Sequence, residues 1–388
     1  MKYELASKSW DASEYQAVMN VFSKNMYKMG GYCSSFEEEF ARWTGAKYAV
    51  FCNSGSSANL LAVAAIRNDP RNNFNSKNEV IVPAVSWSTT YYPLTQMGYK
   101  LKFVDVDPMT FNINIDEIER SISKDTCGIF SVNLLGNPCN YASIEDICDR
   151  NNLWLLEDNC ESMGAMYDGN KTGTFGDIST HSTFFSHHIS TMEGGVCTTD
   201  DELTYELLKS LRAHGWTRDV SNQGLFYSYF EKPKNEFYSS FHFVLPGFNF
   251  RPTEVQGALG IEQLKKIDGF VNQRKANAEY MIKKIEKFDF VKIQKVEKNA
   301  DSSWFGFGLI FKNISIKEKA IKIFFESGIE VRPIVSGNML RQPVFKNLNQ
   351  SPSFSGADKI HDCGVMVGNH QFEIFDQIDL LVEALNEI

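Results

Sequence analysis

The sequence predicts an α/β protein with a mixed, mostly parallel sheet in a large domain, residues 1–255, and a smaller C-terminal α+β domain, residues 256–388. Two observations support this prediction. Short apolar runs alternate with helical runs between residues 36 and 158, which is typical of parallel strands joined by helical crossovers. The chain of 388 residues is also longer than a single hydrophobic core usually supports.

Five short apolar runs predict the strands of the large sheet. They cover residues 48–52, 79–83, 100–106, 127–133 and 154–158. In open α/β sheets, ligands bind at the carboxyl ends of the strands. Ser54, Trp87 and Asp158 follow or end such runs, so they are candidate site residues.

Helical spacing of apolar residues predicts the elements between and after these strands. The expected helices cover residues 36–43, 115–122, 144–151, 316–327 and one long stretch from Thr253 to about Lys287, and residues 306–311 are an expected strand. Residues 216–248 contain many Phe and Tyr residues without a clear period. We expect an ordered excursion that covers a site or a subunit contact.

Composition and charge narrow the class of function. A net charge of −9 argues against nucleic acid or an anionic membrane as the main partner, although it leaves room for a local basic pocket. Residues 1–20 lack the apolar stretch of a signal peptide. The eight cysteines show no paired spacing, which favours reduced thiols in a cytoplasmic protein and no bound metal.

Three motifs suggest chemistry, and each also has an ordinary structural interpretation. The turn at Ser54-Gly-Ser-Ser would present N–H groups to an anion, or simply cap a helix. Asp158 would pair with a protonated ring nitrogen, or be a strand-end carboxylate. Trp87 would stack on a planar cofactor, or fill the core.

An ordered set of motifs over about residues 30–260 favours the functional interpretations. The motifs include Phe36-Glu-Glu-Glu-Phe, Ser54-Gly-Ser-Ser-Ala, Ser86-Trp-Ser-Thr-Thr, Leu135-Gly-Asn-Pro, Leu156-Glu-Asp, Phe175-Gly-Asp-Ile, Thr183-Phe-Phe, Glu193-Gly-Gly and Gly247-Phe-Asn-Phe-Arg-Pro-Thr-Glu. In this order they resemble the fold-type I, pyridoxal-phosphate-dependent family of sugar aminotransferases, which act on nucleotide-linked ketosugars.

The resemblance implies a role for each matching residue in binding pyridoxal 5'-phosphate or pyridoxamine 5'-phosphate. Ser56, Ser57 and Thr183 would bind the cofactor phosphate. Trp87 would stack on the pyridine ring, and Asp158 would pair with its nitrogen.

Further matches imply shared sites. Glu161 stands beside the ring where relatives commonly carry glutamine. Asn249 matches a residue that reaches the cofactor phosphate of the neighbouring subunit, and Arg251 would lie near that site, on the substrate side. The resemblance therefore implies a homodimer with shared active sites.

The family's cofactor-binding lysine is absent. Aligning the Thr183-Phe-Phe motif places His188 at the lysine position, and we favour this register. Counting back six residues from Glu193 selects His187 instead. Imidazole has no primary amine and cannot hold the cofactor covalently, but it can transfer protons near neutral pH. Lys171 lies in a different turn and is a poor substitute.

A base without an amine favours elimination over transamination. The resemblance implies a dehydratase branch of the family that removes the C3 hydroxyl of a GDP-linked 4-keto-6-deoxy sugar of the manno series, with L-glutamate regenerating pyridoxamine phosphate and ammonia released. The alternatives are an ordinary nucleotide-sugar aminotransferase with an atypical histidine, and a non-catalytic protein that binds sugar nucleotides. An iron–sulfur-dependent dehydratase would need a set of cluster-binding cysteines, which the scattered cysteines do not offer.

Overall fold

The computed structural model describes residues 2–25, 27–72, 77–346 and 354–388. Its centre is a seven-stranded sheet in the order β1-β9-β8-β5-β4-β2-β3. Among these strands only β9 runs against its neighbours, which confirms the predicted mixed, mostly parallel sheet. The strands are β1 (Tyr48–Cys52), β2 (Glu79–Pro83), β3 (Lys100–Val104), β4 (Thr126–Val132), β5 (Trp154–Asp158), β8 (Ile178–Ser182) and β9 (Gly195–Thr199).

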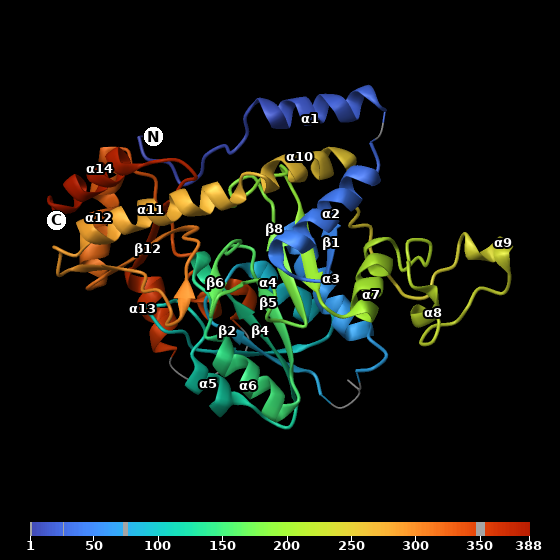
Figure 1. Cartoon of the computed structure of the whole chain (residues 1–388). Coiled ribbons are helices and arrows are strands. Elements are labelled where there is room, and N and C mark those ends of the chain that lie inside the picture. The colour runs from blue at the N-terminus through green and yellow to red at the C-terminus, as the bar shows by residue number, and fades with distance from the viewer. Residues whose placement is uncertain (1, 26, 73–76, 347–353) are drawn as a thin grey trace.

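Helices cover both faces of this sheet (Figure 1). Alternation along β2 shows why: Val80 and Val82 pack in the core that includes helix α3, whereas Ile81 packs with helices α5 and α6 on the opposite face. The helices of this part are α1 (Ala12–Ser23), α2 (Gly31–Thr44), α3 (Gly55–Asn68), α4 (Ser88–Gln96), α5 (Ile115–Ser121), α6 (Tyr141–Asn151) and α7 (Glu202–Arg212).

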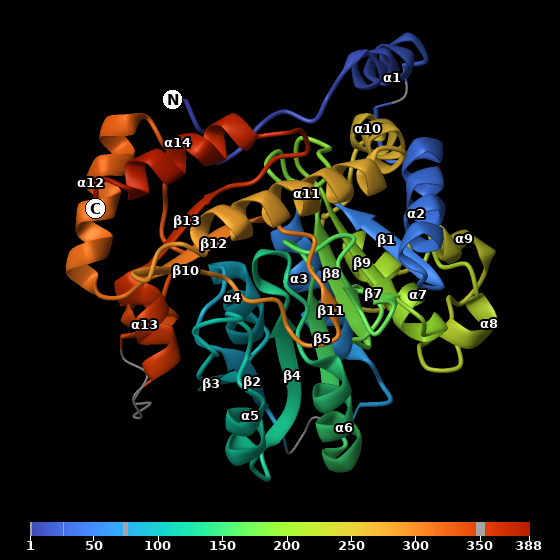
Figure 2. The same cartoon turned by 60° about the vertical axis from the view of Figure 1, so that its left-hand side comes forward.

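The C-terminal part forms a second core around a three-stranded antiparallel sheet in the order β10-β12-β13. Tyr3, near the N-terminus, packs into this core, and its hydroxyl donates to the Gly368 carbonyl. The elements are β10 (Val291–Ile293), β12 (Gly306–Phe311), β13 (Gly364–Gly368), α11 (Ile267–Ile285), α12 (Ile314–Ser327), α13 (Ser355–Cys363) and α14 (Phe375–Leu385). Figure 2 shows this part beside the large sheet, with α11 crossing between them.

The expected helix from Thr253 to Lys287 is in fact two helices. Helix α10 (Glu254–Leu264) ends at Lys265, and α11 begins at Ile267. The domain boundary predicted at residue 255 therefore falls inside α10, which packs against α1 and α2. The Glu254 carboxylate accepts hydrogen bonds from the backbone N–H groups of Gly30, Tyr32 and Cys33, which fixes α10 to the start of α2.

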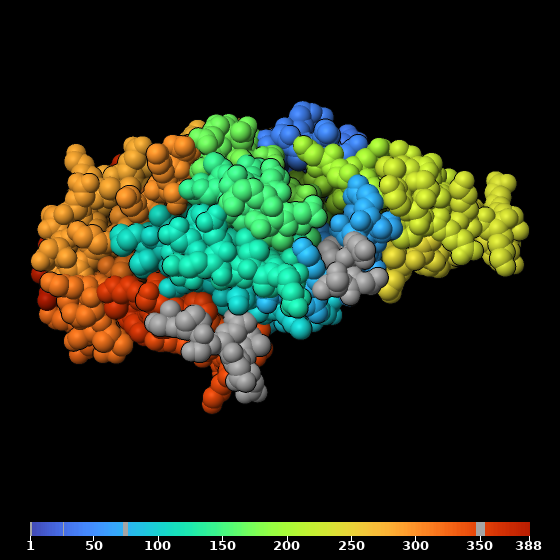
Figure 3. All heavy atoms as spheres, turned by 90° about the horizontal axis from the view of Figure 1, so that it is seen from below, coloured from blue at the N-terminus to red at the C-terminus, as the bar shows by residue number. Residues whose placement is uncertain are grey.

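Residues 216–248 form an irregular segment that extends from the body of the molecule (Figures 1 and 3). It carries two one-turn helices, α8 (Gln223–Phe226) and α9 (Glu236–Ser239). Phe237 and Phe241 are 82% and 72% exposed, although Phe241 stacks on Trp216 and Phe237 contacts Tyr238. The remaining short elements are β6 (Met166–Tyr167), β7 (Asn170–Lys171), β11 (Ala300–Asp301) and the 3-10 turns η1 (Leu134–Gly136), η2 (Met339–Arg341) and η3 (Pro343–Phe345).

Candidate active site

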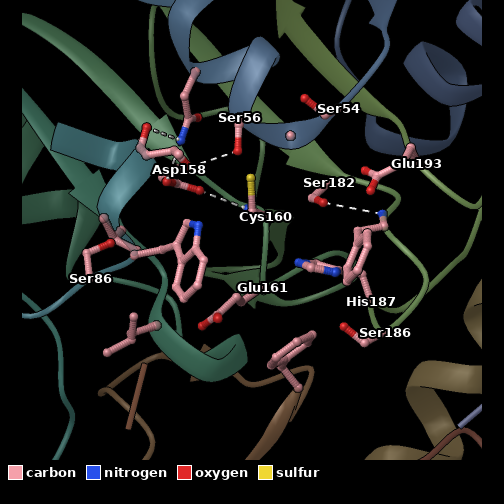
Figure 4. A pocket seen from close by; sticks show the side chains of 18 of the residues that line it. Ser54, Ser56, Ser86, Asp158, Cys160, Glu161, Ser182, Ser186, His187 and Glu193 are labelled. Carbon is pink, nitrogen blue, oxygen red and sulfur yellow. Dashed lines mark hydrogen bonds between the residues drawn. The ribbon is translucent and has the colours of Figure 1, made fainter. Parts of the chain in front are cut away.

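A cavity of about 320 Å³ opens at the carboxyl ends of β5 and β8 (Figure 4). This is the position where open α/β sheets bind ligands. Its walls come from the start of α3, the turn before α4, the loop between β8 and β9, and two residues of the C-terminal part. The lining residues discussed below are Ser54, Gly55, Ser56, Asn59, Trp87, Asp158, Glu161, Ser182, His187, Glu193, Phe305 and Arg332.

The first turn of α3 forms a cradle for an anion. Ser54 caps the helix by accepting a hydrogen bond from Ser57 N–H, at 3.1 Å. Within the described chain the N–H groups of Gly55 and Ser56 have no such partner, so they are free to bind an anion. A side chain at Gly55 would come within 2.6 Å of Ser182 Cβ, which explains why glycine is needed where α3 meets β8. Ser57 itself does not line the cavity.

Asp158 closes β5 and is 5% exposed. Its carboxylate accepts hydrogen bonds from Asn59 Nδ2 at 3.0 Å, Thr90 Oγ1 at 2.8 Å and Cys160 N–H at 3.1 Å. All three donors are neutral, and Asp158 makes no ion pair with the described residues. A buried carboxylate held in place by neutral donors suits a cationic N–H group of a ligand.

Trp87 and Glu161 line the same cavity as Asp158. Trp87 is 55% exposed, so its ring is available to stack on a planar group. Glu161 Oε2 accepts a hydrogen bond from Leu135 N–H at 3.1 Å. Burial raises the pKa of the Glu161 carboxyl, and the positive charge of Arg332 opposes this shift. A carboxyl with a raised pKa is more readily protonated and can then donate a hydrogen bond, as a glutamine amide does.

The two adjacent histidines occupy different environments. His187 lines the cavity, and Figure 4 shows its ring facing the same space as Glu161 and Cys160. His188 is fully buried, does not line the cavity, and its Nε2 lies 3.3 Å from the Ser303 carbonyl oxygen. The rings of both histidines pack near Phe305, with centroids 5.1 and 5.8 Å away. The structure thus places His187, the residue found by counting back from Glu193, in the cavity. His188, the residue aligned from the Thr183 motif, lies outside it.

The His187 ring is neutral at physiological pH. Burial, followed by the positive charges of Arg332 and Arg274, lowers the pKa of His187 to about 3. A neutral imidazole can accept a proton at pH 7, which a protonated one cannot. The ring is therefore in the form that a general base requires.

The same one-residue shift separates Ser182 from Thr183. Ser182 lines the cavity, whereas Thr183 is fully buried outside it, with its hydroxyl 2.5 Å from that of Thr191. The hydroxyl expected of Thr183 at the cavity is thus provided by Ser182. Counting five residues on from Ser182 leads to His187, so both observations fit one register of the loop.

Asn249 and Arg251 do not line this cavity. They lie together at a separate surface hollow, where Arg251 Nε donates to Asn249 Oδ1 at 3.0 Å. Arg332 and Phe305, by contrast, reach the cavity from the C-terminal part without any local motif in the sequence. Glu193 and Asn59 also line it; the first lies in the Glu-Gly-Gly motif and the second follows the Ser54 motif in α3.

The described parts of the chain contain no group of three or more His, Cys, Asp or Glu side chains placed to hold a metal ion. Over the same ranges, every helix is too short or too polar to span a bilayer.

The fold and the cavity together have the arrangement of a fold-type I pyridoxal-phosphate enzyme. Residues 8–385 match the DegT/DnrJ/EryC1/StrS aminotransferase family, and the chain belongs to this family. It is 45% identical over 390 residues to a GDP-4-keto-6-deoxy-D-mannose 3-dehydratase of Escherichia coli, covering 99% of this chain and 100% of that one. An enzyme of the same name from Yersinia pseudotuberculosis is 43% identical, covering 100% and 99% of the two chains.

Solved structures of a 3-dehydratase are also similar to this chain in fold. The E. coli GDP-4-keto-6-deoxy-D-mannose 3-dehydratase with bound hydrated pyridoxal phosphate superposes with a TM-score of 0.94 at 45% identity, covering 99% of each chain. Other structures of this enzyme hold a trapped pyridoxal phosphate–glutamate geminal diamine, or GDP-perosamine in a variant with a histidine changed to asparagine. In another variant the same histidine is lysine, and the serine directly before it is asparagine.

Proposed function

We propose that this protein is a pyridoxal-phosphate-dependent 3-dehydratase that converts GDP-4-keto-6-deoxy-D-mannose to GDP-4-keto-3,6-dideoxymannose. L-glutamate would return the cofactor to its pyridoxamine form, and ammonia would be released. The observation that carries the proposal is the neutral imidazole of His187 in the cavity, where none of the described lining residues is a lysine. The two dehydratases that match over the full chain support the substrate.

The residues of the cavity fit this cofactor. The free N–H groups of Gly55 and Ser56, with the Ser182 hydroxyl, would hold its phosphate. Asp158 would accept a hydrogen bond from the ring N–H, and Trp87 would stack on the ring. Glu161, with its raised pKa, would donate a hydrogen bond to the ring's 3-oxygen in the place of a glutamine.

When bound, the cofactor supplies an electron-withdrawing ring that permits loss of a hydroxide from the sugar's C3. Asp158 keeps the ring nitrogen protonated and so maintains this electron withdrawal. His187 accepts the proton that must leave for elimination to begin, and then donates it to the departing hydroxyl. Burial and the nearby arginines lower the pKa of His187 in the free protein and make its imidazole a weak base. Negative charge bound in the site, such as the cofactor phosphate, would raise this pKa and so make the ring a better proton acceptor at neutral pH.

His187 is assigned this role in preference to His188. The relative's altered serine and histidine are adjacent, and the matching dipeptide in this chain is Ser186-His187. Only His187 of the pair lines the cavity. The preference for His188, which came from aligning Thr183-Phe-Phe, is therefore replaced by His187.

Among the residues that the structure describes around the cavity, Arg332 is the one lysine or arginine. Its guanidinium would pair with a carboxylate of L-glutamate when the donor occupies the cavity. The relative trapped with a pyridoxal phosphate–glutamate adduct supports glutamate as the donor.

We also propose that the active unit is a homodimer with shared sites. Asn249 and Arg251 lie outside the cavity of their own protomer, and the exposed aromatic residues of the 216–248 segment offer a surface for a second copy. The enzyme would act in the cytoplasm, where its eight free thiols would stay reduced.

The fate of nitrogen tests the proposed reaction. The protein is incubated with pyridoxal phosphate, L-glutamate and GDP-4-keto-6-deoxy-D-mannose, and the sugar product is identified by mass spectrometry. We expect a deoxygenated keto sugar and one ammonia for each sugar converted. An amino sugar without free ammonia would instead identify an aminotransferase, and no turnover with bound cofactor would identify a non-catalytic binding protein.

A further inference from the structure

The imidazole of His187 is the base of the proposed reaction, yet no hydrogen bond to its ring orients it within the described chain. Its Nδ1 is buried without a partner, and the same residues supply no partner for Nε2. The torsion that turns a histidine ring about its Cβ–Cγ bond has broad minima, so the rotamer alone does not fix the ring plane. A general base is ordinarily oriented by a third group. In this protein, packing has to supply that orientation.

Two aromatic rings, those of Phe184 and Phe305, lie against the ring of His187. The Phe184 centroid is 5.9 Å from the imidazole centroid with the two planes at 78°, and the Phe305 centroid is 5.1 Å away at 50°. Tilted and edge-to-face pairs at such separations are favourable for aromatic rings. Phe184 is 40% exposed and belongs to the same loop as His187, whereas Phe305 is 7% exposed and comes from the C-terminal part. Phe305 is therefore the more enclosed of the two rings.

The backbone of Phe305 is held from both sides. Its N–H donates to the Leu135 carbonyl at 3.0 Å, and its carbonyl accepts a hydrogen bond from Arg274 Nη1 at 2.9 Å. The same Arg274 nitrogen donates to the Asn369 carbonyl at 2.7 Å, and Arg274 is 3% exposed. These bonds connect Phe305 to the turn after β4, to helix α11 and to the residue that follows β13. The ring of Phe305 consequently has little freedom to move.

The turn that holds Phe305 also holds Glu161. Leu135 N–H donates to Glu161 Oε2 at 3.1 Å, so Leu135 bonds to two residues of the cavity lining. Leu135 and Trp304 both have left-handed backbone conformations, with φ of 54° and 49°. Residues other than glycine adopt this region at a cost, and such strain is concentrated at functional sites. The two strained residues flank the hydrogen bond that sets the position of Phe305, which favours a role for this residue beyond packing.

We propose that Phe305 is a positioning residue for the reaction, because its ring holds the His187 imidazole in one orientation toward the cavity. This inference rests on the proposed function and deepens it. Phe305 transfers no proton itself, so it acts on the rate only through His187. The C-terminal part of the chain thereby contributes to the orientation of a base that belongs to the loop between β8 and β9.

The kinetics of Phe305→Leu test this role. Leucine keeps the position apolar but removes the flat ring, so the imidazole loses one of its two aromatic neighbours and we expect kcat to fall about 10-fold or more. The KM for GDP-4-keto-6-deoxy-D-mannose and the Kd of pyridoxal phosphate should stay within about threefold of the native values. Phe311→Leu, the same change at a fully buried ring in the C-terminal core, is the matched control. It should lower the melting temperature and leave kcat unchanged.

A double-mutant cycle separates positioning from general damage to the cavity. Phe305→Leu is combined with His187→Asn, and the single-turnover rate of C3 deoxygenation is measured with enzyme in excess for the two single variants and the double variant. If Phe305 acts through the imidazole, its substitution should change the rate by less than about twofold once that imidazole is absent. A loss as large in the His187→Asn background as in the native one would overturn the proposal.

Carbethoxylation provides a readout that needs no turnover. Diethylpyrocarbonate reacts with neutral imidazoles, and tandem mass spectrometry locates the modified residue. In the full-length protein incubated with pyridoxal phosphate, we expect His187 to be modified about fivefold faster in Phe305→Leu than in the native chain or in Phe311→Leu, because its ring is less enclosed. Equal rates of modification in the three proteins would contradict a positioning role for Phe305.

The outcomes distinguish this inference from the proposed function. Turnover by the native protein with an unchanged kcat in Phe305→Leu would overturn the inference and leave the proposed function intact. A raised KM with the native kcat would assign Phe305 to substrate binding, and it would also overturn the inference. No turnover of the GDP sugar by the native protein would overturn the proposed function, and the rates of carbethoxylation would still test whether Phe305 holds the ring of His187.

Discussion

At the carboxyl edge of the sheet, some side chains face the active-site cavity and others face the protein interior. Two pairs of adjacent, chemically similar residues are divided in this way. Asp158 and His187 face the cavity, while Glu157 and His188 face the interior. Glu157 is fully buried, and its two oxygens accept hydrogen bonds from Asn133, Gly173, Phe175 and Ser179. The interior members of each pair are surrounded by the protein's own groups.

This contrast shows that a shift of one residue along the chain separates side chains that can contact a ligand from side chains that support the fold. Side chains alternate along a strand, so Glu157 and Asp158 necessarily point to opposite faces of β5. Glu157 uses its hydrogen-bonding capacity within the fold, and His188 does so through Nε2 alone, since its buried Nδ1 has no partner among the described residues. Substitutions on the cavity face should therefore affect rates, and substitutions on the interior face should affect stability.

The largest expected effect is on the histidine pair. His187→Asn removes the proton acceptor, so kcat should fall about 1000-fold, within the range for loss of a general base, while the cofactor still binds. His188→Asn should keep kcat within about threefold, because the ring does not reach the cavity, although losing its contact to Ser303 should lower the melting temperature. Steady-state kinetics with the GDP sugar and a thermal melt of both variants measure the contrast. Greater loss of kcat in His188→Asn than in His187→Asn would reverse the assignment.

The carboxylate pair gives the next largest effect. Asp158→Asn replaces the charge that would hold the ring nitrogen protonated, and we expect kcat to fall about 100-fold or more. Glu157→Gln instead turns an amide toward the donors of Gly173 and Phe175, which should lower the free energy of unfolding by about 1–3 kcal/mol with little change in kcat. Urea unfolding and kinetics on both variants distinguish them. Equal losses of kcat would contradict the division of the two faces.

The hydroxyl pair at the end of β8 should show a smaller effect. Ser182→Ala removes a phosphate contact, so the Kd of pyridoxal phosphate should rise about 10-fold. Thr183→Val should leave this Kd within about twofold, since its hydroxyl pairs with Thr191. Fluorescence titration with pyridoxal phosphate provides the measurement. A greater loss of affinity in Thr183→Val would place the sequence register one residue away from that in the structure.

Interior imidazoles should make stability depend on pH. Burial lowers the pKa of His181 to about 3, below the value of about 6.5 in an unfolded chain. The unfolded state therefore binds more protons between these values, and stability is complete above about pH 6.5 and is lost as the pH falls. Between pH 7 and pH 5 the loss from one such ring is about 2 kcal/mol. Urea unfolding at one protein concentration should show a shallower pH dependence for His181→Asn; an equal slope would contradict this.

Local sequence signals predicted the sheet well and the site only in part. Strands β1, β2 and β5 begin and end where their apolar runs do, because burial on both faces leaves an unbroken hydrophobic pattern. The interruption at Lys265 and Lys266 was missed, since helical spacing continues on both sides of it. Asp158 and Trp87 were found because strand ends in such sheets are ligand sites.

The remaining site residues depend on tertiary structure. Arg332 and Phe305 reach the cavity from a part of the chain more than 100 residues from the Ser182–Glu193 loop, and no local pattern marks them. The choice between His187 and His188 could not be made from spacing, because the two motifs on either side gave different registers. The strand end at Ser182 and the packing of Phe305 decide which ring faces the cavity.

Borohydride reduction tests most directly whether the His187 imidazole occupies the position of the missing lysine. Native protein, His187→Lys and His188→Lys are each loaded with pyridoxal phosphate and reduced, and their peptides are analysed by mass spectrometry. We expect a pyridoxyl group on the peptide containing residue 187 in His187→Lys, and no labelled peptide in the native protein or in His188→Lys. A label in the native protein, or in His188→Lys alone, would contradict the account.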